Sequence, residues 1–277
     1  MAAAAVLMQG NIKFDGALVM QIFGDGPVKV AVAEVQSDLR LRATASVVGA
    51  VTPGMRLPEM VNAHGKGRCA ITLDPRNRQE GQQPYQGVVP LVGEGGAPLM
   101  DLAAVVEHYM RQSEQLDTTL VLAADEQVAA GLLIQRLPVQ GQDNLSQSSV
   151  AREDAGEAAE DDYQRIAILA KSLKREELLG LDADTILRRL FWEENLMRFE
   201  PLAGAQGPRF ACSCSRSRVA AMLKGLGQDE AEDILKEQGQ IEVGCDFCGQ
   251  QERFDAVDVG RLFTPAAQQS PEPGSVQ

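Results

Sequence analysis

Residues 12–35 read IKFDGALVMQIFGDGPVKVAVAEV, an apolar stretch that is divided by two turn signals. The signals are Asp15-Gly16 and Asp25-Gly26-Pro27, and both combine residue types that favour tight turns. The sequence therefore predicts two hairpins: Ile12–Phe14 turns into the strand Ala17–Phe23 at the first signal, and the next strand follows the second signal. Residues 12–35 are therefore expected to form neighbouring strands of a sheet.

The strand-like pattern continues well beyond these hairpins. Residues 41–46 alternate between apolar and polar, which is typical of a sheet with one solvated face. Between Pro98 and Gln112 the apolar residues recur every three or four positions, and this spacing predicts an amphipathic helix. The further strands that we expect are Val28–Val35, Leu39–Val48, Cys69–Leu73, Gly87–Val92, Thr118–Leu122 and Leu132–Leu137. We therefore predict a sheet-rich α+β core domain over residues 1–139, with helices packed on it.

A polar and acidic segment interrupts this pattern at residues 140–162. Residues 151–162 hold six acidic side chains and one arginine, so they offer little to bury, and we expect an exposed, mobile linker. Apolar residues at helical spacing then predict helices between 163 and 192, with Asp182 near the start of the second one. We assign residues 140–206 to an acidic loop and helical linker.

Four of the five cysteines lie close together near the end of the chain. Cys212-x-Cys214 is followed, after thirty residues, by Cys245-x-x-Cys248-Gly249. Zinc binds four thiolates in a tetrahedron, a Cys-x-x-Cys turn presents two sulfurs to one ion, and the glycine relieves the tight backbone. The sequence predicts one Zn²⁺ per chain, held by Cys212, Cys214, Cys245 and Cys248 in a zinc-binding domain over residues 207–264.

The predicted zinc domain is small, so its fold and its metal depend on each other. Phe247, Phe254 and Phe263 are its candidate hydrophobic cover, and a structural zinc contributes on the order of 10 kcal/mol to folding. The spacing leaves two interpretations open: a permanent structural staple, or a redox site whose thiolates are oxidised to disulfides and release the metal. The proline-containing end, residues 265–277, predicts a disordered tail.

The remaining candidates for chemistry are few. Cys69 lies in an apolar strand, where a free cysteine is most often a small buried hydrophobe. His64 and His108 are far apart in sequence and have no nucleophile motif beside them. We assign no catalytic residue and expect a protein that is not an enzyme.

Charge and the N-terminus limit the class of partner. The 277 residues carry 26 basic and 39 acidic side chains, a net charge of −13, which argues against binding to nucleic acid or to an anionic membrane. Met1–Met8 is apolar, but no positive charge precedes it and it is too short to span a bilayer, so we expect a cytoplasmic protein. Because no capping residue precedes this run, it looks like the end of a helix.

Several segments between about residue 10 and about residue 260 match one known pattern. They are Lys13-Phe14-Asp15-Gly16, Gly24-Asp25-Gly26-Pro27, Tyr85-Gln86-Gly87-Val88-Val89, Tyr109-Met110-Arg111-Gln112-Ser113-Glu114-Gln115-Leu116, Phe210-Ala211-Cys212-Ser213-Cys214-Ser215 and Cys245-Asp246-Phe247-Cys248-Gly249. Together they resemble the redox-regulated heat-shock chaperones, the 33 kDa chaperonin family. The cysteine pattern and the Ser-Glu-Gln-Leu segment are the specific part of this resemblance.

The resemblance implies an ATP-independent holdase chaperone that acts in oxidative stress. It implies an inactive, reduced state with zinc bound, and an oxidised state in which the pairs Cys212/Cys214 and Cys245/Cys248 are closed and zinc is released. The oxidised state would hold unfolded or aggregation-prone polypeptides and form a homodimer. The family has a further N-terminal segment before the position of Met1, so we expect that this chain is truncated or that its start is misassigned.

The apolar helix faces between 163 and 205 then have two interpretations. They pack on a neighbouring core in the reduced protein, as such faces usually do, and our hypothesis is that loss of zinc undocks them to bind clients.

The sequence also allows two other functions. One is a constitutive zinc ribbon that binds a protein partner or nucleic acid, although residues 207–264 carry seven basic and ten acidic side chains, which weakens the nucleic-acid version. The other is a thiol-disulfide oxidoreductase that uses Cys245-Asp-Phe-Cys248. Such motifs normally open a helix after a strand, whereas here the apolar run Ile241–Val243 is short and Gly249 follows.

Overall fold

The structure is a computed structural model of the whole chain, and it describes residues 1–79, 81–136, 149–197, 199 and 204–264. The predicted tail at 265–277 lies outside the described residues. The chain divides into two compact units, Met1–Phe210 and Ala211–Gln277. The predicted start of the zinc-binding domain, residue 207, lies close to this boundary, and the division of the first unit at 139/140 stays a prediction.

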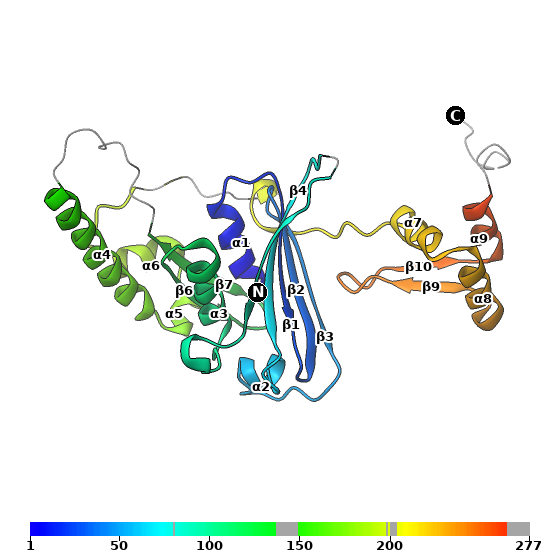
Figure 1. Cartoon of the computed structure of the whole chain (residues 1–277), viewed down its shortest axis with the longest axis horizontal. Helices are drawn as coiled ribbons and strands as arrows, with labels where there is room; N and C mark the ends of the chain where they lie inside the picture. Colours follow the sequence, from blue (N-terminus) through cyan, green and yellow to red (C-terminus); the bar gives the residue numbers. More distant parts are fainter. Residues whose placement is uncertain (80, 137–148, 198, 200–203, 265–277) are drawn as a thin grey trace. The chain divides into compact units, whose positions relative to one another are not determined.

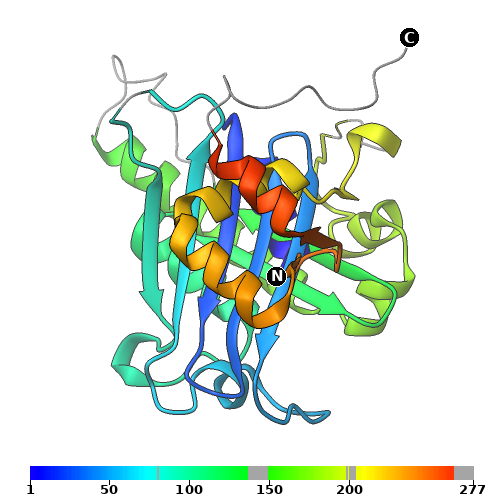
Figure 2. The same cartoon turned by 90° about the vertical axis from the view of Figure 1, so that its right-hand side faces the viewer.

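A six-stranded sheet forms the centre of the first unit (Figure 1). Its strands, in spatial order, are β5 (Tyr85–Pro90), β4 (Arg68–Pro75), β1 (Gly16–Phe23), β2 (Val28–Gln36), β3 (Arg40–Val47) and β8 (Arg209–Phe210). Figure 2 looks onto the broad face of this sheet, where the strands run side by side. All neighbours are antiparallel except β8, which adds to the edge of β3 in parallel. The hairpin that was predicted at Asp25-Gly26-Pro27 joins β1 to β2, which confirms it.

The other predicted hairpin, at Asp15-Gly16, is wrong. Residues 12–14 form no strand, and β1 begins at Gly16. A Cβ atom on Gly16 would lie 2.2 Å from the carbonyl oxygen of Asp74 on β4. The glycine at this position therefore allows two backbones to approach closely, a role that the local sequence does not separate from that of a turn glycine.

One face of the sheet carries the main core. Leu18, Met20 and Ile22 alternate along β1 and are almost fully buried. Their partners on the flanking strands are small or apolar: Val35, Ala33 and Ala31 on β2, and Leu73, Ile71 and Cys69 on β4. Two helices contribute to the same core, α1 (Ala2–Asn11) and α3 (Leu102–Tyr109). The apolar N-terminus is helical, as expected, and so is part of the segment between 98 and 112.

Two of the segments that carry the family resemblance meet beside this core. The turn η2 (Met110–Glu114) continues α3, and Gln115 after it has a left-handed backbone with φ 56°. The hydroxyls of Tyr85 and Tyr109 both donate to one oxygen of Glu114, at 3.1 and 3.0 Å. Gly87 lies so close to this group that a Cβ there would be 2.7 Å from the Tyr109 ring. The glycine therefore lets β5 lie directly on Tyr109.

A smaller sheet and three helices complete the first unit. The sheet is the hairpin of β6 (Thr118–Ala124) and β7 (Ala129–Gln135), and the helices are α4 (Ser149–Lys171), α5 (Arg175–Gly180) and α6 (Ala183–Leu190). A second core lies between them and contains Ala170, Leu173, Leu178, Ile186, Leu190 and Phe191, packed on apolar side chains of β6 and β7. Asp182 caps α6 by accepting from the Thr185 amide at 2.9 Å, as its sequence position suggested. The apolar helix faces are therefore packed on a core.

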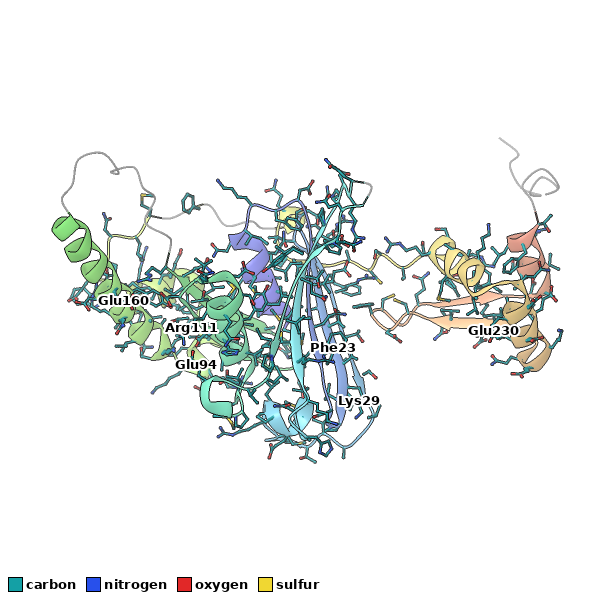
Figure 3. The ribbon with its side chains drawn as sticks, in the orientation of Figure 1. Phe23, Lys29, Glu94, Arg111, Glu160 and Glu230 are labelled. Carbon is teal, nitrogen blue, oxygen red and sulfur yellow. The ribbon has the colours of Figure 1, made fainter. Side chains whose placement is uncertain are left out.

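The mobile linker predicted over 140–162 is corrected in part. Residues 140–148 lie outside the described residues, but 149–162 form the first part of α4. Alanine, glutamate and arginine are strong helix formers, so a segment with little to bury can still extend a packed helix. Glu160, labelled on α4 in Figure 3, pairs with Arg136, which also pairs with Asp117 at 2.8 Å.

The second unit is a small α/β module. It consists of α7 (Arg216–Leu226), α8 (Gln228–Gln238), the hairpin of β9 (Ile241–Gly244) and β10 (Gln251–Phe254), and α9 (Ala256–Phe263). Its core is formed by Leu223, Ala231, Ile241, Phe254 and Val259. Phe254 and Phe263 belong to this packing as predicted, but Phe247 does not, because it lies in the turn between Cys245 and Cys248.

Three short elements connect the others: α2 (Leu57–Val61), η1 (Glu94–Gly96) and η3 (Gly204–Gln206). Within the part of the chain that the structure describes, no helix is both long and apolar enough to cross a membrane.

Candidate metal centre

Two short segments of the second unit carry the four cysteines. Cys212 and Cys214 lie in the extended chain between β8 and α7, and Ser215 directly after them caps α7 by accepting from the Arg218 amide at 3.3 Å. Cys245 and Cys248 lie in the turn that joins β9 to β10. The start of a helix and the end of a hairpin therefore present one pair each.

The hairpin turn is held by its own backbone. The Cys245 amide donates to the Gln250 carbonyl at 2.9 Å, and the Gly249 amide donates to the Cys245 carbonyl at 2.8 Å. Gly249 has φ 73°, in the left-handed region where glycine has no steric cost. The role that the sequence suggested for this glycine is the one it has.

The four sulfurs form one cluster. All four Sγ atoms lie within 4.8 Å of one another. The Sγ atoms of Cys212 and Cys245 are 3.5 Å apart, and those of Cys214 and Cys248 are 3.3 Å apart. A disulfide bond is about 2.05 Å long, so these are free thiols.

This arrangement fits a zinc ion. With Zn–S bonds of about 2.3 Å, a tetrahedral site has sulfur–sulfur edges of about 3.8 Å. This value lies between the shorter distances of the cluster, 3.3 and 3.5 Å, and its upper limit of 4.8 Å. Four thiol groups without a carboxylate or imidazole are also the donor set that zinc and other soft metals prefer. The structure therefore brings the four predicted ligands together in a geometry that suits the predicted metal.

The local electrostatics favour a thiolate at one position. The Cys214 amide donates to the Cys212 sulfur, and with further hydrogen bonds from the neighbouring thiols it lowers the pKa of Cys212 to about 6. Hydrogen bonds with Cys248 and then with Cys212 raise the pKa of Cys214 to about 12. The cluster therefore holds a nucleophilic sulfur near neutral pH.

Two polar residues beside the cysteines were missed from the sequence. The Cys214 thiol lies 3.6 Å from Oε1 of Gln250, and Arg218 donates to the Ser213 hydroxyl at 2.6 Å. Cysteine spacing carries no signal for such contacts, because they depend on how the two segments face each other.

The chain is similar to known proteins over most of its length. Residues 1–255 match the HSP33 family model, described as Hsp33 protein. The chain belongs to the Hsp33 family. The family resemblance of the sequence is thereby confirmed, and membership places this chain among chaperones.

Individual Hsp33 relatives are similar over most of their length. The 33 kDa chaperonin of Chromobacterium violaceum is 43% identical over 263 residues, which are 95% of this chain and 79% of that protein. The 33 kDa chaperonin of Methylobacillus flagellatus is 42% identical over 264 residues, with the same shares. The crystal structure of the 33 kDa chaperonin of Thermotoga maritima, at 20% identity, covers 94% of this chain and 82% of its own with a TM-score of 0.66. This last likeness, together with the sheet and helices above, confirms the predicted α+β fold.

The fifth cysteine lies far from this cluster in the sequence and has a different environment. Cys69 is fully buried in β4, where it pairs with Ile22 and Val89 on the neighbouring strands. Burial raises the pKa of Cys69 to about 12. It is the small core side chain that the sequence predicted.

We expect a thiol reagent to modify the four cysteines of the cluster once the metal is removed, and Cys69 only after the first unit is denatured. The unfolded chain releases the Cys69 proton near pH 8.5, whereas the folded chain keeps it up to about pH 12. Rising pH in this window therefore favours the unfolded state, so stability falls. Denaturant titrations between pH 8 and 11 are expected to show a smaller loss in Cys69→Ala than in the parent, and equal losses would contradict this.

Proposed function

We propose that this Hsp33 protein is a redox-regulated holdase chaperone that works without ATP. In the reduced state Cys212, Cys214, Cys245 and Cys248 hold one Zn²⁺, and the protein is inactive. Oxidation closes two disulfides, releases the metal and lets the protein bind unfolded polypeptides and prevent their aggregation. The observation that carries this proposal is the cluster of four thiols within 4.8 Å in a member of a chaperone family.

The residues of the cluster have separate roles in this proposal. Bound zinc would supply the positive charge that keeps four neighbouring sulfurs deprotonated. The turn of β9 and β10 fixes the second cysteine pair through its backbone hydrogen bonds, and the cap of α7 at Ser215 fixes the end of the first pair. All four sulfurs, that of Cys212 among them, would then be thiolates, which is the form that reacts with an oxidant.

Hydrogen peroxide is the oxidant class that fits a thiolate of this kind. The Cys212 sulfur attacks one peroxide oxygen, the O–O bond breaks, and the leaving hydroxide takes a proton to become water. A neighbouring thiol then attacks the resulting sulfenic acid, so that the S–S bond forms and a second water leaves. Each disulfide thus consumes one peroxide, and each pair of thiols loses two electrons and two protons.

The family resemblance favours the pairs Cys212/Cys214 and Cys245/Cys248. In the reduced cluster the Cys212 sulfur lies 3.5 Å from that of Cys245, and the Cys214 sulfur lies 3.3 Å from that of Cys248. A disulfide between either of these two pairs requires the sulfurs to move closer by more than 1 Å, so these contacts do not fix the pairing. We retain the pairs within each motif, because loss of the metal separates the two segments and leaves each pair tethered by one or two residues.

The client-binding surface in this proposal is the second core of the first unit. The helices α5 and α6 bury apolar side chains on β6 and β7, and their release would expose both faces. The strand β8 follows the helical linker in the sequence, pairs with β3 of the large sheet and ends two residues before Cys212. We propose that unfolding of the small unit acts on the helical linker through this connection along the chain.

The remaining parts of the proposal concern partners and place. The clients are unfolded or aggregation-prone polypeptides, the oxidised form is a homodimer, and the protein acts in the cytoplasm without enzymatic turnover. A net charge of −13 keeps a protein with exposed apolar surface soluble and disfavours nucleic acid and anionic membranes.

One experiment tests this function. Reduced, zinc-loaded protein is treated with peroxide under mild heat, and zinc, free thiols and suppression of aggregation of a denatured test protein are measured. We expect one zinc lost per chain, a fall from five free thiols to one, and a gain of suppression that a reductant reverses. Peptide mapping then identifies the pairs. A protein that keeps its zinc and stays inert would instead be a constitutive zinc ribbon.

A further inference from the structure

One arginine beside the cluster contacts residues outside its own helix. Arg216 is the first residue of α7, two positions after Cys214. A cation at a helix N-terminus is disfavoured by the helix dipole, and the first turn of α7 has no acidic residue to offset it. The reason for an arginine at this position therefore lies in contacts outside the helix.

Those contacts all lie on the part of the module that follows the second cysteine pair. Arg216 donates from Nη1 to the backbone carbonyl of Arg253 at 2.6 Å and from Nη2 to Oδ2 of Asp258 at 2.7 Å. Its guanidinium lies over the Phe254 ring, 4.1 Å from the centroid, and 3.6 Å from the carboxylate of Glu252. One side chain thus contacts both β10 and α9.

The partners of Arg216 are themselves fixed. Phe254 is 2% exposed in the core of the module, and Glu252 is mostly buried. Asp258 belongs to the capping box of α9, in which it and Asp255 bond each other's amides. A guanidinium fork that meets a backbone carbonyl, a carboxylate and a ring at once has little freedom to move.

These contacts close a ring of chain, because they join the two cysteine segments at a second point away from the sulfurs. The segment Cys214–Arg216 forms one side of it, and the segment Cys248–Phe254 forms the other. The sulfurs of Cys214 and Cys248, 3.3 Å apart, meet at one end, and Arg216 joins the segments at the other. Arg216 therefore joins the segment of the first cysteine pair to the segment of the second, in addition to the contact between the sulfurs.

We infer that Arg216 is a positioning residue of the metal centre, which sets the zinc affinity by fastening the Cys212–Cys214 segment to β10 and α9. This inference rests on the proposed function only in that the four cysteines bind zinc. Residues outside the ligand set that hold ligands in place contribute about 10- to 100-fold to metal affinity. Without Arg216, zinc binding also has to order the Cys212–Cys214 segment. The zinc affinity then falls by the free-energy cost of that ordering.

The test compares full-length reduced protein with three variants. Arg216→Met keeps the aliphatic length and removes the fork, and Arg216→Lys keeps the charge but has one nitrogen. Arg253→Met is the matched control, because the Arg253 side chain is exposed and pairs across the hairpin with Glu242 at 2.9 Å. Zinc affinity is measured by competition with a chelator, and Co²⁺ absorption and far-UV circular dichroism are recorded at saturating metal.

We expect zinc affinity to fall about 10- to 100-fold in Arg216→Met and by less in Arg216→Lys, with no more than about a threefold change in Arg253→Met. The Co²⁺ thiolate bands and the circular dichroism at saturation remain those of the parent, which a general loss of folding would not allow. If Arg216→Met does not fold at saturating zinc, Arg216→Lys decides, and a parental affinity in that variant overturns the inference.

Different results would overturn the positioning role of Arg216 and the proposed function. Equal zinc affinity in Arg216→Met and Arg253→Met overturns the positioning role and leaves the proposed function standing. A parent protein that binds no zinc through its thiols overturns the proposed function itself.

Discussion

Replacement of Cys245 by serine is expected to weaken zinc binding at least about a hundredfold and to leave residues 211–264 without a stable fold. A structural zinc held by four thiolates is worth about 10–16 kcal/mol, so one lost ligand removes a large share of it. Among its described residues the small unit has a core of five buried side chains, which does not replace that contribution. The loss of the metal and the loss of the fold should therefore coincide.

The measurement combines chelator competition with hydrogen exchange. Amides of α7, α8 and α9 are expected to lose protection in Cys245→Ser, while those of β1 and β4, which belong to the other unit, keep it. Cys69→Ala is the control, since it removes a cysteine that lies outside the cluster, and it should bind one zinc with parental affinity. A Cys245→Ser protein with parental zinc affinity and protected helices would refute the proposed ligand set.

Oxidation is expected to raise amide exchange across α5 and α6 by two orders of magnitude or more. These short helices are held mainly by the second core, in which Leu178, Ile186 and Leu190 are buried on the β6–β7 hairpin. Once the helices undock, little remains to protect them, because isolated helices of this length are unstable in water. Unchanged protection after complete oxidation would exclude this surface as the site of clients.

A pair of variants separates undocking from oxidation. Ile186→Ala removes a buried side chain of α6 and should cost about 2–4 kcal/mol, enough to populate the undocked state without oxidant. Ile168→Ala is the matched control, because Ile168 on α4 is 70% exposed. We expect suppression of client aggregation by reduced Ile186→Ala but not by reduced Ile168→Ala, and the same inactivity in both would argue against the helical linker as the switch.

The strands and the metal cluster could be predicted because their signals are local. Alternating residues and the turn at Asp25-Gly26-Pro27 located β1 and β2 to within one residue at their ends. The spacing of the cysteines was sufficient to name the four thiols that meet within 4.8 Å. In both cases the signal, a two-residue repeat or a pair of closely spaced cysteines, lies in neighbouring positions of the chain.

The predictions were wrong or missing where a residue or segment packs on a part of the chain that is distant in the sequence. Gly16 looked like a turn residue, but it makes room for the backbone of β4. The acidic composition of residues 149–162 suggested a mobile linker. The second half of the same helix, α4, is packed on the second core, and the local composition of the first half carries no sign of this packing. Arg216 gave no signal at all, since its partners lie about forty residues further along the chain.

The strand β8 lies directly before the first cysteine pair in the sequence, so its pairing with β3 bears on that pair. It consists of two residues, and the backbone bond from Arg209 to the Leu39 carbonyl, at 3.2 Å, is supported by the Arg209 side chain on the carbonyl of Asp38 at 3.0 Å. Only Ala211 separates β8 from Cys212. A disulfide that strained this connection would therefore weaken the shortest strand pairing of the large sheet. By linkage, loss of that pairing would favour the same disulfide to the same degree.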